Sequence, residues 1–177
     1  MKLLSSWRRW EIFLTEENWK VYAIKKAKDS TKKWAIKKEI VILTYLKDKV
    51  SFVPKIVDWG DDWFKYEFIP WKTLDKVKLD INSQKKIYRK LIEYAFKLDL
   101  LNVEHWELSR PTKNIIVNNS ELFIIDFERW NLMNKSFKNI KALWQFFAWL
   151  WFVNFEKLKK IKPEELKTFL TKQIDLL

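Results

Sequence analysis

Three charged side chains occur within otherwise apolar stretches of the sequence. Glu39 shares the apolar face of a predicted helix, where a carboxylate needs a cationic partner to offset the loss of its hydration. Asp126 ends an apolar run, where a buried carboxylate is costly unless a cation or hydrogen-bond donors receive it. Lys25 ends a run with strand character. Taken singly, each feature is also typical of ordinary structure, because strand-ending aspartates occur in turns and most lysines are solvated.

Together with two further segments, these residues supply the parts that phosphoryl transfer requires. The reaction needs a backbone cradle for phosphates, a lysine on those phosphates, oxygen ligands for Mg²⁺ and a group that positions the attacking hydroxyl. The segment SSWRRWEI at 5–12 is the candidate cradle, and Lys25 is the candidate lysine. The polar segment HWELSRPTKN at 105–114 offers a glutamate and an asparagine ahead of Asp126. Candidates for all four parts therefore follow one another along the chain.

Residues 1–70 are expected to form a small antiparallel sheet with one helix. Alternating and β-branched residues predict the strands, and apolar residues at i, i+4 and i+7 predict the helix that carries Glu39. A turn that begins at Gly60 separates the last two strands. The predicted strands are 11–14, 20–26 and two within 55–69, and the predicted helix is 35–46.

Residues 71–177 are expected to be mainly helical. The longest helix has one apolar stripe and runs from an N-cap at Asn82 or Ser83 to about residue 100. The fold class is therefore α+β, in a single domain of residues 1–177 with a boundary between two lobes near 70–73. The other predicted elements are strands at 115–117 and 122–126, a turn at 118–120 between them, and helices within 136–153 and 163–176.

The composition narrows the classes of partner and compartment. A formal net charge of +12 favours polyanions such as RNA or a phosphorylated ligand, although lysines spread along helix faces are mostly solvated surface. With no cysteine and one histidine, disulfide frameworks and zinc sites built from thiolates or histidine clusters are excluded. The longest apolar run, 142–153, is shorter than the ~20 residues of a membrane span. The N-terminus also lacks secretory features, so a cytoplasmic protein is expected.

Tryptophan and glycine occur in unusual numbers. The chain has 12 Trp and one Gly, whereas glycine averages ~7% of residues. Asn18-Trp19 lies between two predicted strands, where Asn-Gly would form a type I′ turn. We hypothesise that opal codons meaning glycine in the source organism are translated here as tryptophan; the alternative is a protein truly rich in tryptophan. The positions in question are Trp7, Trp10, Trp19, Trp34, Trp71, Trp106, Trp130 and Trp144.

Several motifs resemble those of the protein-kinase superfamily. VYAIK at 21–25 resembles the V-A-I-K strand, and LFIIDFE at 122–128 resembles the strand that ends in D-F-G or D-F-E. EFIPW at 67–71 resembles the hinge E-Y-I-x-G, and SSWRRWEIF would be a glycine-rich loop if its tryptophans were glycines. The segment 105–114 is similar to HGELSRPxKN of minimal, archaeal-type serine/threonine kinases related to the RIO proteins. The resemblance covers roughly residues 5–130.

This resemblance implies a kinase-like fold that binds ATP and Mg²⁺. The implied fold has an N-terminal β lobe with one helix, about 1–70, and a truncated, mainly helical C-terminal lobe, about 71–177. The loop departs from the usual pattern, because Glu replaces Asp and Asn follows seven rather than five residues later. The implied catalytic residues are Glu107 and Lys25, and the implied metal ligands are Asn114 and Asp126. The implied ATP-binding residues are Ser5, Trp7, Trp10, Ile12, Lys25, Glu39, Glu67, Phe68 and Ile69.

Other functions are compatible with the same sequence. The first expectation is a phosphotransferase acting on protein serine or threonine, or on itself; its protein substrate is unknown. A pseudokinase or an ATP-driven switch on an RNA–protein assembly would bind nucleotide with little transfer. A small-molecule kinase would share the motif order. A basic, aromatic single-strand binder would instead use tryptophans as stacking platforms and need no ATP site.

Overall fold

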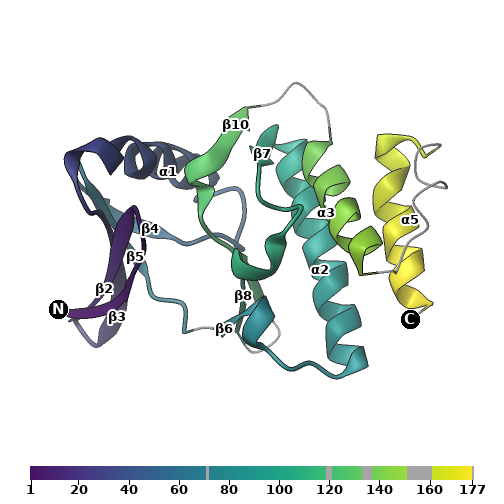
Figure 1. The fold of residues 1–177 in the computed structure, drawn as a ribbon, viewed down its shortest axis with the longest axis horizontal. Coiled ribbons are helices and arrows are strands. Elements are labelled where there is room, and N and C mark those ends of the chain that lie inside the picture. The colour runs from purple at the N-terminus through teal and green to yellow at the C-terminus, as the bar shows by residue number, and fades with distance from the viewer. Residues whose placement is uncertain (71, 119–120, 133–136, 151–160, 177) are drawn as a thin grey trace. The chain divides into compact units, whose positions relative to one another are not determined.

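The structure is a computed structural model that describes residues 1–70, 72–118, 121–132, 137–150 and 161–176 (Figure 1). It divides into two compact units. The first unit comprises Met1–Pro70 and Phe123–Arg129, and the second comprises Trp71–Leu122 and Trp130–Leu177. Antiparallel sheet and separate helices make this an α+β protein, as the sequence predicts.

The first unit is a five-stranded antiparallel sheet with one α-helix. The strands lie in the order β1-β2-β3-β5-β4, and α1 packs against β3, β4 and β5. The helix buries an apolar face together with Glu39, which confirms the predicted stripe. The bounds are β1 Lys2–Ser6, β2 Trp10–Glu17, β3 Lys20–Ala27, η1 Ser30–Lys32, α1 Lys33–Leu46, β4 Ile56–Trp59, β5 Trp63–Glu67 and η4 Phe127–Arg129.

The turn between β2 and β3 has the backbone that Asn-Gly sequences adopt. Glu17 pairs with Lys20, so the loop is the two residues Asn18 and Trp19, with φ values of 50° and 65°. A type I′ turn requires positive φ at both positions. The Trp19 side chain is 96% exposed, so packing does not explain its presence. Among the described tryptophans, position 19 is the one where the backbone itself favours glycine.

Among its described residues, the second unit is built on three packed helices with short strands beside them. Figure 1 draws α2, α3 and α5 in this unit, and the aromatic rings of α2 and α3 meet in their core, with Tyr88 and Phe147 centroids 5.2 Å apart. Strand β7 pairs with β10, and β6, β8 and β9 form a second small sheet. The bounds are β6 Lys72–Thr73, η2 Leu74–Lys76, α2 Ile81–Leu100, β7 Val103–His105, η3 Pro111–Lys113, β8 Ile115–Asn118, β9 Glu121–Ile124, β10 Trp130–Leu132, α3 Lys138–Trp149 and α5 Pro163–Asp175.

Several predicted boundaries are wrong. Strand β2 continues to Glu17, beyond the predicted end at 14. The N-cap of α2 is Asp80, whose carboxylate accepts the N–H groups of Asn82 and Ser83 at 2.9 and 3.0 Å. The helix therefore starts earlier than its apolar stripe, because the carboxylate satisfies the first free N–H groups. The strand predicted at 122–126 ends at Ile124. Position 71, the centre of the predicted turn at 118–120 and the outer parts of the predicted helix 136–153 lie outside the described residues.

Candidate functional site

The predicted lysine, glutamate and aspartate meet in the first unit. Lys25, on β3, is 5% exposed, and its Nζ lies 2.6 Å from Glu39 Oε2 and 3.0 Å from Asp126 Oδ1. Glu39 comes from α1, and Asp126 follows β9, 101 residues after the lysine. A hydrogen bond of 2.8 Å from Ile124 N–H to the Phe52 carbonyl holds the preceding chain in this unit. One ammonium therefore bridges two carboxylates from separate parts of the sequence.

The charge of Lys25 interacts with those of Glu39 and Asp126. Burial by itself would lower the pKa of Lys25, but the charges of Glu39 and Asp126 outweigh it and hold that pKa above its usual value. Burial raises the pKa of Glu39 to about 7, although the nearby ammonium opposes the rise. With both carboxylates ionised, one positive charge faces two negative charges. In that state the group carries a net charge of −1 and favours an additional cation.

Asp126 is held by its backbone as well as by the lysine. Its φ is 66°, in the left-handed region that aspartate tolerates better than most residues. The next residue, Phe127, is fully buried and donates its N–H to Glu39 Oε1 at 3.3 Å. Glu39 thus binds Lys25 with one oxygen and the backbone after Asp126 with the other. The Asp126 side chain keeps 20% exposure, which suits an oxygen ligand that must remain accessible.

The predicted phosphate cradle lies beside this lysine. Ser5 on β1 pairs with Ile12 on β2, and Ile12 pairs with Lys25 on β3, so the three residues form one row across the sheet. The turn between β1 and β2 is closed by a hydrogen bond of 2.9 Å from Trp7 N–H to the Trp10 carbonyl. The ring of Trp10 lies 3.9 Å from Lys25 Nζ. An indole therefore covers one side of the ammonium, where a glycine would leave open space.

The hinge-like segment 67–69 already uses part of its backbone within the sheet. Phe68 donates its N–H to the Val21 carbonyl at 3.1 Å, and Glu67 donates to the Lys55 carbonyl at 3.2 Å. Ile69 is 8% exposed. An adenine ring at this segment would therefore have to contact backbone groups other than these two N–H groups.

The predicted catalytic loop lies in the second unit, and its two functional residues touch. Asn114 Nδ2 donates to Glu107 Oε2 at 2.6 Å across seven residues of chain. Glu107 N–H in turn lies 3.3 Å from Nδ1 of His105, which is 2% exposed. The short helix η3, which begins at Pro111, brings Asn114 back towards the start of the loop. The longer spacing therefore still places the carboxylate beside the amide.

A buried network that the sequence did not suggest supports this loop. Asn139 is fully buried at the start of α3, and its amide donates to Asp99 Oδ1 at 2.9 Å and to the Val103 carbonyl at 2.6 Å. Its oxygen accepts the N–H of His105 at 2.8 Å. Burial raises the pKa of Asp99 to about 6, while hydrogen bonds from Asn139 and Ile140 oppose the rise. The signal in the sequence that could have indicated this network is Asp99, which lies on the otherwise apolar stripe of α2.

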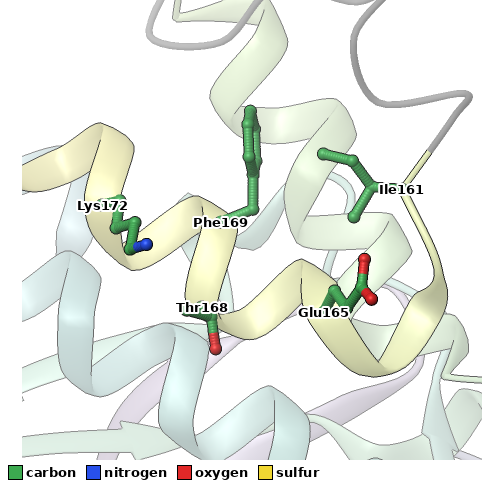
Figure 2. A pocket seen from close by; sticks show the side chains of 5 residues that line it. All are labelled: Ile161, Glu165, Thr168, Phe169 and Lys172. Carbon is green, nitrogen blue, oxygen red and sulfur yellow. The ribbon is translucent and has the colours of Figure 1, made fainter.

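A separate pocket lies on α5 in the second unit (Figure 2). Its volume is about 380 Å³, and its lining comes mainly from one face of the helix. None of its lining residues belongs to the predicted site. They are Ile161, Glu165, Thr168, Phe169 and Lys172.

Comparison with known proteins does not assign the chain to a family. No family model matches it. The curated proteins yield no match either. Among the described helices, none has both the length and the hydropathy that crossing a membrane requires. Function must therefore be argued from the residues themselves.

Proposed function

We propose that this chain is a minimal, kinase-like phosphotransferase that binds Mg-ATP and transfers the γ-phosphate to a hydroxyl group, of which protein serine or threonine is the expected class. The observation that carries the proposal is the bridge from Lys25 to both Glu39 and Asp126. In protein kinases a strand lysine paired with a helix glutamate positions the phosphates, and an aspartate after a strand holds Mg²⁺. The Lys25–Glu39 pair with Asp126 beside it supplies the same residue types.

The chemistry assigns a task to each residue of this bridge. Lys25 would bind the α- and β-phosphates, and Glu39 would keep its ammonium charged and oriented. Asp126 would exchange its contact with the lysine for one with Mg²⁺, since carboxylate oxygen is a preferred ligand of that ion. These three residues use only groups within the first unit.

Within this proposal, the transfer step is assigned to the pair in the second unit. Glu107 would accept the proton of the substrate hydroxyl. The hydroxyl oxygen would attack the γ-phosphorus as the bond from that phosphorus to the ADP oxygen breaks. Asn114, which now donates to Glu107, would offer its amide oxygen to Mg²⁺. A glutamate in this role has one more methylene than aspartate, and its hydrogen bond to Asn114 limits the freedom of the longer arm.

The decisive experiment is transfer of labelled γ-phosphate from Mg-ATP to the chain itself and to a serine-rich protein. It uses the chain with glycine at positions 7 and 10, because the Trp10 ring covers Lys25 Nζ and position 7 is the other candidate glycine of the loop. Lys25→Met and Asp126→Asn should each lower incorporation at least about a hundredfold. Lys26→Met is the matched control, because this neighbouring lysine is exposed. Incorporation that persists in Asp126→Asn contradicts the proposal.

A nucleotide-dependent switch is the second candidate, and the position of Trp10 favours it. If this tryptophan is genuine, its ring covers Lys25 Nζ and competes with phosphate for the ammonium. The unmodified chain would then bind Mg-ATP with reduced but measurable affinity and transfer little phosphate. Two measurements on the unmodified chain and on Trp10→Gly separate the two functions: calorimetry detects binding of Mg-ATP, and labelled ATP detects transfer of phosphate. Binding heat without incorporation of label in both chains favours the switch. Incorporation of label favours the phosphotransferase.

A further inference from the structure

The turn between β1 and β2 carries an arginine that is bound close to the candidate nucleotide site. Arg9 Nη1 forms an ion pair with Glu128 Oε1. Glu128 lies on η4, two residues after Asp126, and its side chain is 5% exposed. The neighbouring residue, Trp10, places its ring on Lys25. Arginine and tryptophan from one turn therefore contact the two segments that supply the lysine and the aspartate.

From these contacts we infer that Arg9 is a phosphate-binding residue and that Glu128 holds its guanidinium in the absence of nucleotide. The inference rests on the proposed function. Guanidinium binds carboxylate and phosphate through the same planar fork of donors, so a carboxylate can occupy the place of a phosphate oxygen. The ligand class is a nucleoside di- or triphosphate; a nucleoside alone would gain nothing from Arg9.

The backbone of the turn fixes Arg9 while its side chain can move. Lys28 donates its N–H to the Arg9 carbonyl at 3.1 Å, and the turn is closed between residues 7 and 10. The Arg9 side chain is 36% exposed, so a change of rotamer needs no rearrangement of the sheet. Transfer of the guanidinium from Glu128 to phosphate would leave a buried carboxylate. The cost of leaving that carboxylate without its arginine lowers the affinity that Arg9 adds.

This arrangement predicts opposite effects for the two partners. Arg9→Gln removes a donor to phosphate, and the loss of one charged hydrogen bond should weaken ATP binding about tenfold. Glu128→Gln removes the competitor for the guanidinium, so it should tighten ATP binding severalfold. A purely structural ion pair predicts instead that both substitutions loosen the turn and shift affinity in the same direction.

The test is calorimetric titration of the full chain with Mg-ATP and, separately, with adenosine. Arg8→Gln is the matched control, because it removes the same charge from an exposed neighbour in the same turn. Arg9→Gln leaves Glu128 buried without its arginine and can unfold; the double variant Arg9→Gln/Glu128→Gln avoids this and should bind ATP as weakly as the arginine variant. Circular dichroism verifies folding in each case.

The possible outcomes separate this inference from the proposed function. Opposite shifts for ATP, with Arg8→Gln within about twofold of the parent and adenosine unaffected, support it. Equal affinities in all variants, or shifts of the same sign, overturn the role of Arg9 alone. If neither the parent chain nor any variant binds ATP, this inference fails, and the transfer assay on the chain with glycine at positions 7 and 10 decides the proposed function separately.

Discussion

Replacement of Trp19 by glycine should stabilise the protein. The residue has a φ of 65° in a two-residue turn, and a left-handed conformation costs a side chain with a Cβ about 1–2 kcal/mol. Glycine removes this cost but loses more backbone entropy on folding, by about 0.5–1 kcal/mol. The indole is 96% exposed, so its removal sacrifices almost no buried surface. The net expected gain is about 0.5–1 kcal/mol in the free energy of unfolding.

For a chain of this length, that gain corresponds to a rise in melting temperature of about 1–4 °C. Circular dichroism is the appropriate probe, because removal of a tryptophan alters fluorescence directly. Trp19→Ala is the matched control: it also removes the indole but keeps the Cβ that makes positive φ unfavourable. If the glycine variant is no more stable than the alanine variant, the backbone argument for glycine at this position is wrong.

Three further perturbations follow from the buried polar groups and the helix cap. Because the pKa of Glu39 is about 7, its carboxylate is protonated as pH falls through 7, and nucleotide affinity should drop roughly tenfold from pH 8 to pH 6. Asn139→Leu should cost about 3 kcal/mol in urea unfolding, because it removes the side-chain donor to Asp99 and to the Val103 carbonyl and leaves the N–H of His105 without its buried acceptor. Two backbone N–H groups still bind Asp99 in this variant. Asp80→Ala should cost about 1 kcal/mol by removing the cap of α2.

Each of these predictions has a distinct control. Glu39→Gln should remove the pH dependence of nucleotide affinity, and a dependence that survives it would have to arise from another group.

The raised pKa of Glu39 gives the folded state more bound protons than the unfolded state between about pH 4.5 and 7. The contribution of Glu39 to stability therefore declines as pH rises through that window. Asp80→Asn should retain most of the stability that the α2 cap contributes, because asparagine is also a good N-cap. If the stability of Asn139→Leu stays within about 0.5 kcal/mol of the parent, the buried hydrogen bonds of Asn139 do not stabilise the protein as argued.

The local pattern of the sequence determined most of the first unit. Alternating residues and turn signals predicted the hairpin and the strands around Gly60, and the helix that carries Glu39 emerged from its apolar spacing. These elements depend on neighbouring residues, whose preferences are readable along the chain. The short strands β6, β7 and β10 did not emerge, because two or three residues carry too little periodicity. The start of α2 was missed because Asp80 lies outside the apolar stripe.

The tertiary structure decided which charged residues meet. The sequence indicated that Glu39 and Asp126 each needed a cation, and resemblance to kinases suggested Lys25, but spacing alone could not show that one ammonium serves both. Arg9 with Glu128, and Asn139 between Asp99 and His105, are pairings over 119, 40 and 34 residues. Hydrogen bonds and ion pairs act over a few ångströms of space, whatever their separation along the chain. The sequence by itself therefore determines which charged and polar side chains need a partner when they are buried. The packing of the elements in the tertiary structure decides which partners they find.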